Sequence, residues 1–212
     1  TDDISGNENN GTIVGNVSLT EDRFNNSNSA YYFPGERGSY IDVDHNSSFS
    51  GITDGFTLSV WTTYQNHSSN SRLIEIGNPD GNRKGITVTV NSNSKNWYGY
   101  IWTGPNGGIG IPYPNQVVEE DVWIHLILTF DFTSGDSKIY INGNLIGEKS
   151  VENYINVFNS YDLSDRIFNI GRKTESNFDP WKGKIDDIAI WNRVLTDIEI
   201  TTISDPTFEL NP

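Results

Sequence analysis

Short stretches of alternating apolar and polar residues recur along the chain, and this period of two is typical of β-strands. The clearest alternation lies in Phe56–Tyr64, where Phe56, Leu58 and Val60 fall on one face. Clusters of Gly, Pro, Asn and Asp separate these stretches and predict turns. The pattern predicts the following strands: Thr12–Val17, Ala30–Phe33, Tyr40–Val43, Phe56–Tyr64, Arg72–Ile76, Ile86–Val90, Tyr98–Thr103, Ile109–Ile111, Arg166–Gly171 and Lys184–Trp191.

Two successive hairpins are predicted beyond the middle of the chain. Trp123–Phe130 is a long apolar and β-branched run, and Lys138–Ile141 resumes the alternation after a polar turn. Asn142 and Gly143 then precede Leu145–Ile146, and Asn-Gly between apolar runs is a strong signal for a type I′ turn. The apolar faces of two such hairpins must pack on a second sheet. The sequence therefore predicts an all-β sandwich or barrel.

The 212 residues fit one large β domain, residues 1–212, because neither a linker nor an internal repeat interrupts the pattern. Helical periodicity is confined to one predicted turn, Leu195–Ile200, with Thr196 as its cap and Glu199 three residues on. The sequence contains no Met and does not open on a signal peptide. We therefore expect a domain of a longer polypeptide, with attached domains beside it.

Charge and composition exclude several classes of function. The formal net charge of -14 disfavours nucleic acid and anionic membrane surfaces as partners. No apolar run approaches the roughly 20 residues of a membrane span, so membrane insertion is not expected. The absence of Cys excludes disulfides, thiolate metal sites and cysteine nucleophiles.

A family resemblance rests on five stretches that occur in a fixed order: Asp3–Asn7 with Gly11 and Thr12, Ala30–Gly35 with Tyr40 and Ile41, Phe56–Trp61, Trp123–His125 with Ile139–Gly143, and Gly183–Leu195. Together they span nearly the whole chain. On these stretches the chain resembles bacterial laminin-G-like, concanavalin A-like jelly-roll domains. The resemblance implies a two-sheet antiparallel jelly-roll sandwich with ligands on its concave face or rim loops. It also implies that the first and last strands pair at one edge and bring the termini together. Lectins, glycanases, adhesins and interaction modules share this fold, so the fold alone does not decide the function.

The resemblance further implies one structural Ca²⁺ where the N-terminal arm meets the last strand. Asp186 matches the aspartate that supplies a ligand there, and Asp3 and the carbonyls around Gly35 and Gly38 are further candidate ligands. Ca²⁺ takes about six to eight oxygen ligands, which carboxylates and carbonyl-rich turns supply. The alternative is that Asp186 only bonds backbone amides or pairs with Lys184.

A row of aromatic residues is the main candidate for ligand binding. Strand alternation places Tyr98, Tyr100 and Trp102 on one face, opposite Ile101, which suits the core. Rings at the spacing of alternate strand residues offer flat faces to the C–H side of pyranose sugars. The same row could instead fill the concave face or be covered by a loop, and the sequence leaves both possibilities open.

Further candidate ligand residues flank this row. Trp181 lies in the loop before the final strand and could close one end of a groove, and Tyr113 could line its other side. Arg72, Asn82 and Arg83 lie in or beside strands of the same face and could donate hydrogen bonds. By contrast, three other tryptophans occupy family framework positions, where we expect them to pack: Trp61, Trp123 and Trp191.

Catalytic residues are not evident. Retaining glycanases of this fold carry two carboxylates on one strand face, about 5 Å apart, and no strand here has that spacing. Asp186 and Asp187 are adjacent and so face opposite sides of a strand, and Glu119–Asp121 precedes a strand. His125 occupies a framework position and is expected to be structural. We therefore expect no enzymatic activity.

The function predicted from the sequence is a non-catalytic carbohydrate-binding module of a larger secreted or cell-surface bacterial protein. Its partner would be a polysaccharide or oligosaccharide, and Ca²⁺ would stabilise the fold. A protein–protein interaction or spacer module of an extracellular adhesin is the alternative. Solvent exposure of Tyr98, Tyr100 and Trp102 favours the first hypothesis, and their burial favours the second.

Overall fold

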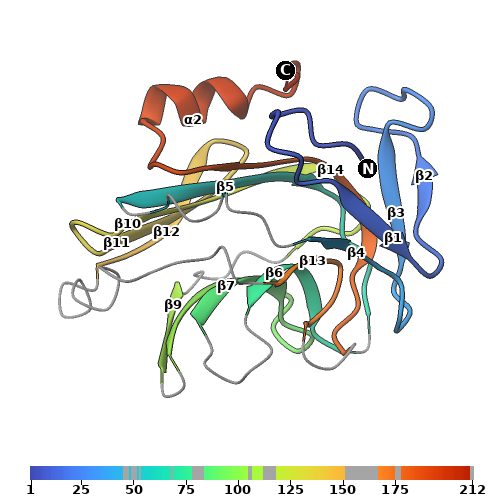
Figure 1. Ribbon diagram of the computed structural model, residues 1–212, viewed down its shortest axis with the longest axis horizontal. Helices are drawn as coiled ribbons and strands as arrows, with labels where there is room; N and C mark the ends of the chain where they lie inside the picture. The colour runs from blue at the N-terminus through green and yellow to red at the C-terminus, as the bar shows by residue number, and fades with distance from the viewer. Residues whose placement is uncertain are drawn as a thin grey trace.

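Two antiparallel β-sheets of seven strands each face one another in the computed structural model (Figure 1). The structure describes residues 1–44, 48, 52, 54–67, 69–77, 84–104, 107–111, 118–150, 167–174 and 178–210. Sheet A has the order β1 (Gly11–Val14), β4 (Tyr40–Val43), β13 (Ile167–Ile170), β6 (Ser71–Gly77), β7 (Lys84–Val90), β8 (Trp97–Gly104), β9 (Gly107–Ile111). Sheet B has the order β12 (Asn144–Ser150), β11 (Asp136–Ile141), β10 (Ile124–Asp131), β5 (Gly55–Thr62), β14 (Lys182–Trp191), β3 (Ala30–Pro34), β2 (Ser18–Thr20). The predicted jelly-roll sandwich is confirmed.

The two predicted hairpins form one side of sheet B. β10 pairs with β11, and β11 pairs with β12 across the Asn142–Gly143 turn. Both turn residues have positive φ, 49° and 76°, as a type I′ turn requires. On its other side β10 pairs with β5 from Ile124 to Asp131, so the hairpins are anchored at the centre of the sheet.

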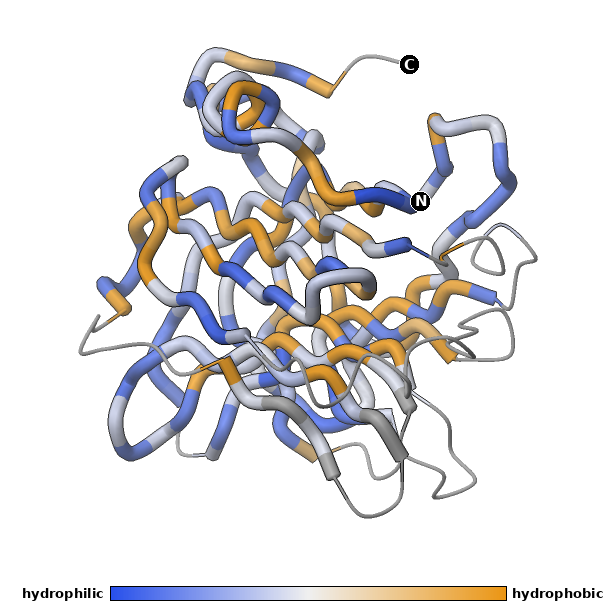
Figure 2. Tube along the Cα trace, turned by 90° about the vertical axis from the view of Figure 1, so that its left-hand side faces the viewer, coloured by the Kyte–Doolittle hydropathy of each residue, from blue (hydrophilic) through white to orange (hydrophobic). Residues whose placement is uncertain are grey.

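The core lies between the sheets because each strand turns its apolar positions inward. Figure 2 shows hydrophobic and hydrophilic residues alternating along the strands. Buried side chains of the two inner faces form one cluster, to which β7 of sheet A and β10 of sheet B contribute the following: Ile86, Val88, Val90, Leu126, Leu128 and Phe130. Burying each such side chain stabilises the fold by about 1.5–3 kcal/mol relative to exposure.

Helix α2 (Asp197–Ile203) covers the outer face of sheet B, the face turned away from sheet A (Figure 1). It begins with the predicted capping box, in which Thr196 and Glu199 bond each other's backbone N–H groups. Ile200 and Ile203 pack on Ile127 of β10. Among the described residues, no helix combines the length and hydropathy that a membrane span requires.

His125 is a structural residue beneath this helix, as the sequence predicts. Its imidazole is 1% exposed and stacks on Trp61 at 4.7 Å between ring centroids. Nε2 lies 2.6 Å from Oγ of Ser59, and Nδ1 lies 3.2 Å from Oγ of Ser204. Burial, together with repulsion from Arg23, lowers the pKa of His125 to about 3. The ring is therefore neutral and bonded through both of its nitrogens.

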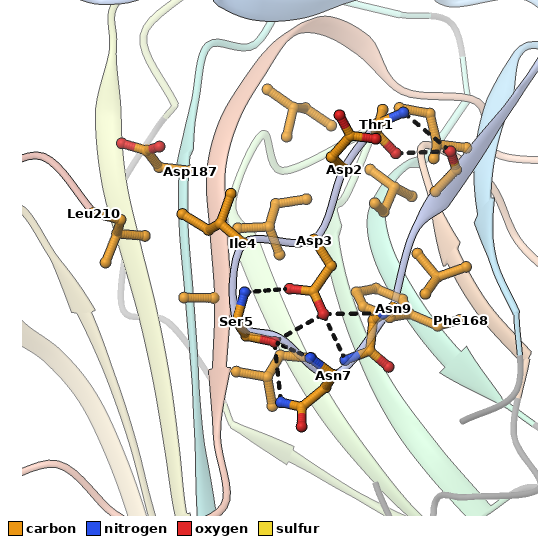
Figure 3. Close-up of a pocket in the computed structure, with 18 of the residues that line it drawn as sticks. Thr1, Asp2, Asp3, Ile4, Ser5, Asn7, Asn9, Phe168, Asp187 and Leu210 are labelled. Carbon is orange, nitrogen blue, oxygen red and sulfur yellow. Dashed lines mark hydrogen bonds between the residues drawn. The ribbon is translucent and has the colours of Figure 1, made fainter. Parts of the chain in front are cut away.

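The predicted pairing of the first and last strands is wrong. β1 is the edge strand of sheet A and pairs with β4, whereas β14 lies inside sheet B between β5 and β3. Strand neighbours are chosen by long-range packing, which a motif order does not encode. The first and last described residues nevertheless lie on the same side of the molecule, because Thr1 and Leu210 line one cavity (Figure 3).

Candidate functional site

Six strands of sheet A align one row of residues on the outer face of this sheet. The cross-strand partners in this row are, in order, Asp42, Asn169, Glu75, Thr87, Tyr100 and Gly110. Their strand neighbours Ile76, Val88 and Ile101 point into the core, so the row itself faces away from sheet B. The outer face of sheet A is thus polar at the β4 side and aromatic at the β9 side.

Tyr98, Tyr100 and Trp102 form an aromatic ladder along β8. The rings of Tyr98 and Tyr100 are 6.2 Å apart between centroids and inclined by 13°, and those of Tyr100 and Trp102 are 5.5 Å apart and inclined by 15°. All three side chains are half-buried, whereas the intervening Ile101 is fully buried. The predicted alternation is confirmed. Tyr100 and Trp102 lie on the outer face, and Tyr98, at the end of the ladder, also packs against the core cluster.

Two glycines of β9 make room for the ladder. A Cβ atom on Gly108 would lie 2.8, 3.1 and 3.3 Å from Cε3, Cζ3 and Cδ2 of Trp102. Such similar distances to three neighbouring atoms place the glycine under the face of the indole rather than at its edge. A Cβ on Gly110 would likewise lie 3.0 Å from Cε1 of Tyr100. These rings therefore lean over β9, and the opposite face of the indole points away from the sheet.

A hydrogen bond fixes the orientation of the indole. Nε1 of Trp102 donates to Oγ1 of Thr87 on the neighbouring strand β7 at 2.9 Å. Thr87 is fully buried beneath the aromatic residues. The ring is thus held on two sides, by the hydrogen bond to Thr87 and by the backbone of Gly108 beneath its face. We call this position over Gly108 the glycine seat. A ring held in place loses little conformational entropy when a ligand stacks on it.

The polar side of the same face is held together by two arginines. Nε of Arg72 lies 3.0 Å from Oε2 of Glu75, and its Nη2 lies 3.5 Å from Asp179. Nη2 of Arg172 lies 3.1 Å from Oδ1 of Asp42, and its guanidinium stacks 3.6 Å above the ring of Tyr40. Each arginine is therefore matched by carboxylate within the protein.

The structure places the other predicted ligand residues differently. Trp181 does not close a groove: it is 0% exposed and packs in the core, 5.8 Å from the ring of Trp97 and 5.5 Å from that of Tyr64. Arg72 holds two carboxylates rather than an open position. Tyr113, Asn82 and Arg83 lie outside the described residues.

Two of the candidate calcium ligands, Asp3 and Asp186, line one cavity, and each has partners within the protein. Nη1 of Arg23 lies 3.2 Å from Asp186 and 2.7 Å from Asp187, so one guanidinium faces both carboxylates. The prediction that these adjacent residues face opposite sides of a strand is therefore wrong, because Asp187 has a positive φ of 44° at an irregularity of β14. Burial and then repulsion from Asp187 raise the pKa of Asp186 to about 7, against the attraction of Arg23. Gly35 and Gly38 lie in the β3–β4 turn. Over the described ranges, no group of three His, Cys, Asp or Glu residues could hold a metal.

Asp3 also has a different task, which Figure 3 shows. Its carboxylate accepts hydrogen bonds from the backbone N–H groups of Ser5 and Asn9 and from their side chains. Although burial raises it, these bonds lower the pKa of Asp3 below its usual value. Asp3 therefore organises the N-terminal arm, and the calcium site stays a prediction.

The N-terminal arm covers a cavity of about 840 Å³ between the sheets (Figure 3). Its walls are largely apolar, with Phe168 and Ile170 from sheet A and Ile185 and Ile190 from sheet B. The carboxylates of Asp3 and Asp186 that border it are bonded within the protein. The cavity thus has an apolar interior and a polar border whose carboxylates are engaged within the protein. We therefore take the outer face of sheet A as the better candidate site.

The glycine seat was not among the sequence predictions, although a signal for it exists. Gly108 and Gly110 alternate with Ile109 and Ile111, directly after a strand whose aromatic residues also alternate. Glycine weakens a strand and commonly marks a close approach by another group. Two glycines on one strand face beside a row of large rings therefore indicate that the rings lie across that strand.

Residues 34–201 match a family model described as the concanavalin A-like lectin/glucanases superfamily. Botulinum neurotoxin type E of Clostridium butyricum is 26% identical over 179 residues, which are 79% of this chain and 14% of the toxin. Botulinum neurotoxin type F of Clostridium botulinum is 26% identical over 160 residues, 71% of this chain and 12% of the toxin. The chain thus spans a small part of these relatives.

Solved structures share the fold. The binding domain of botulinum neurotoxin DC in complex with SialylT matches with a TM-score of 0.68 and 17% identity, over 95% of this chain and 47% of that one. The same binding domain in complex with rat synaptotagmin II matches with a TM-score of 0.70 and 18% identity, over 95% and 48%. A structure of botulinum neurotoxin type C, whose cell entry depends upon interaction with two ganglioside molecules, matches with a TM-score of 0.69 and 17% identity, over 95% and 47%.

Proposed function

Because the chain belongs to the concanavalin A-like lectin/glucanases superfamily, we propose that it is a non-catalytic carbohydrate-binding module. It serves a larger secreted or cell-surface bacterial protein, and it binds a glycan on the outer face of sheet A. The observation that carries this proposal is the aromatic ladder, in which the face of Trp102 is turned outward over Gly108. Rings of this kind are apolar surfaces that suit the C–H side of a sugar.

The geometry favours modest affinity with little reorganisation. The site is an open face, so binding depends on ring contacts and a few polar contacts. The bond from Trp102 to Thr87 holds the indole in position before a ligand arrives. Such a module raises the local concentration of its attached domains on a glycan surface, and multivalent attachment would raise the avidity further.

Glycan recognition by related proteins supports the proposal. One similar solved structure is a complex with SialylT, and another concerns a toxin whose cell entry depends on gangliosides. This chain covers about half of those chains, 47% in both cases, so their ligands suggest a class of partner and not a specific sugar.

A binding role fits the carboxylates of this face better than catalysis. Glu75 and Asp42 both lie in the row across sheet A, and each faces an arginine. A glycanase needs two carboxyl groups that face the sugar, whereas these two pair with guanidinium groups of the protein, at 3.0 Å for Glu75 and 3.1 Å for Asp42.

A protein–protein interaction module is the second candidate function. The complex of a similar binding domain with rat synaptotagmin II favours it. In that case the outer face of sheet A would contact a protein, and no glycan would bind there.

The deciding experiment is a glycan array with the isolated domain, run with calcium and with chelator. Trp102→Ala tests the site, and Phe178→Ala is the matched control, because Phe178 is an exposed aromatic residue that stacks on Arg37. Glycan binding that Trp102→Ala removes and Phe178→Ala preserves supports the proposal. An array without any bound glycan, or binding that survives Trp102→Ala, overturns it.

A further inference from the structure

We infer that the outer face of sheet A selects a neutral, ribbon-shaped glycan, such as a β-1,4-linked polysaccharide, over anionic sugars and helical chains. This inference rests on the proposed function and names the class of ligand for the same site. Three features carry it: the common orientation of the rings, their placement along one strand, and the internal pairing of the arginines.

The rings of the aromatic ladder share one orientation. Tyr98, Tyr100 and Trp102 are inclined to their neighbours by only 13° and 15°. A ribbon-shaped chain presents the faces of successive sugars in nearly parallel planes, so that more than one ring can be contacted at once. A helical chain turns successive sugars to different angles, so that it contacts one ring well and the next poorly.

The ladder also sets the direction of the ligand. Its three residues alternate along β8, and their centroids are 6.2 and 5.5 Å apart. Sugars on adjoining rings would therefore be consecutive residues of one chain that runs along β8. We expect affinity to rise with oligosaccharide length until the chain spans the ladder.

The charges of this face disfavour an anionic ligand. Arg72 faces Glu75 and Asp179, and Arg172 faces Asp42. An anionic sugar would have to compete with these carboxylates on a protein of net charge -14. Neutral hydroxyl groups carry no such penalty.

One described cation lies at the border of the ladder and provides a control. Nζ of Lys149 on β12 donates to the carbonyl of Gly110 at 3.4 Å. If the site recognised an acidic sugar, this exposed ammonium group would be a natural partner, and Lys149→Gln would weaken binding. For a neutral ligand, Lys149→Gln should leave the affinity unchanged.

The test is calorimetric titration of the domain with five probes of equal length: cellohexaose, β-1,4-mannohexaose, maltohexaose, hexagalacturonic acid and an α-2,8-linked sialic acid hexamer. We expect one of the two β-1,4-linked hexasaccharides to bind at least about tenfold more tightly than maltohexaose and both acidic probes. This affinity should not change with added salt, since no ion pair forms. It should fall in Trp102→Ala and persist in Lys149→Gln.

Two contrary results distinguish a failure of the proposed ligand class from a failure of the carbohydrate-binding function. Tighter binding of maltohexaose or an acidic probe, lost in Trp102→Ala, overturns the ligand class and leaves the carbohydrate-binding function in place. Absence of binding by all five probes overturns the ligand class. If the glycan array is also empty, the carbohydrate-binding function fails with it.

Discussion

The indole of Trp102 covers Gly108 so closely that a Cβ atom on the glycine would stand 2.8 Å from Cε3 of the ring. Real Cβ atoms do not approach a ring so closely, so the two residues depend on each other. Gly108 provides the seat, and the bond to Thr87 keeps the indole in it. The binding face is therefore shaped by a residue that would contribute no side chain to the ligand.

Gly108→Ala is expected to weaken glycan binding about tenfold by lifting the indole from its seat, which is a cost of roughly 1.4 kcal/mol. Stability should fall by about 1 kcal/mol or less, because the ring can move outward. Calorimetric titration and thermal melting measure the two effects.

Gly77→Ala is the matched control in the same sheet. A Cβ on Gly77 would meet its nearest atom at 3.6 Å, which is ordinary contact. It should leave both affinity and melting temperature unchanged. Equal affinity of the two variants would show that the seat does not shape the site.

The sequence predicts the fold well because its signals are local. The alternation in Phe56–Tyr64 and the Asn142–Gly143 turn each depend on a few neighbouring residues, and both are found in the structure. The orientation of Tyr98, Tyr100 and Trp102 follows from the same period of two. Local patterns therefore place a side chain on a face, and they do so reliably.

The rest of the site depends on contacts between distant segments. Asp42 and Asn169 are 127 residues apart in the sequence and share a hydrogen bond of 2.5 Å. They meet only because β4 and β13 are neighbours in sheet A. Trp181 follows Pro180 in a polar loop, and its burial arises because it fills the space beside Trp97 between the sheets. No periodic pattern encodes such contacts, so the sequence assigned Trp181 to a groove.

Arg23→Met is expected to lower the melting temperature, because it leaves Asp186 without its cation. The side chains of Arg23 and Asp186 are only 4% and 11% exposed, and the variant also loses the bonds of the guanidinium to Asp187 and to the carbonyl of Phe208. Thermal melting of the variant and the wild type measures the loss. A melting temperature equal to that of the wild type would show that the pair contributes nothing.

The calcium prediction is tested by the same melting curves with calcium and with chelator. A bound ion at a hundredfold excess over its Kd stabilises the native state by about 2.7 kcal/mol, so chelation should lower the melting temperature. Asp186→Ala should then abolish the response to calcium. If chelation changes nothing, Asp186 has only its bonds within the protein, to Arg23 and to the backbone N–H of Asp187.

His125 is expected to make stability fall at acidic pH. Its pKa is lowered from 6.5 to about 3 by burial and by Arg23, so the unfolded chain takes up the proton first. The contribution of His125 is fully present above pH 6.5 and is lost as the pH falls towards 3. His125→Gln keeps hydrogen-bonding groups without this titration. Between pH 7 and 5, the melting temperature of the variant should fall less than that of the wild type. Equal falls would show that His125 does not cause the loss of stability.

Arg72→Met distinguishes a structural arginine from a ligand-binding one. Arg72 is held by Glu75 and Asp179, so its loss should lower the melting temperature. The affinity for a glycan, measured where the variant is folded, should remain within about twofold of the wild type, a change of less than about 0.5 kcal/mol. A large loss of affinity without a loss of stability would show that Arg72 contacts the ligand.

Trp102 provides the sharpest test of the binding face, through two substitutions. Trp102→Ala removes the ring and should cost about 1–3 kcal/mol of binding, mainly through a faster off-rate. Trp102→Phe keeps a ring over Gly108 but loses the bond from Nε1 to Thr87, so it should retain part of the affinity. Surface-based kinetics and circular dichroism measure binding and folding separately. Because the side chain is half-buried on the outer face, both variants should fold. A folded Trp102→Ala protein that binds its glycan unchanged would place the site elsewhere.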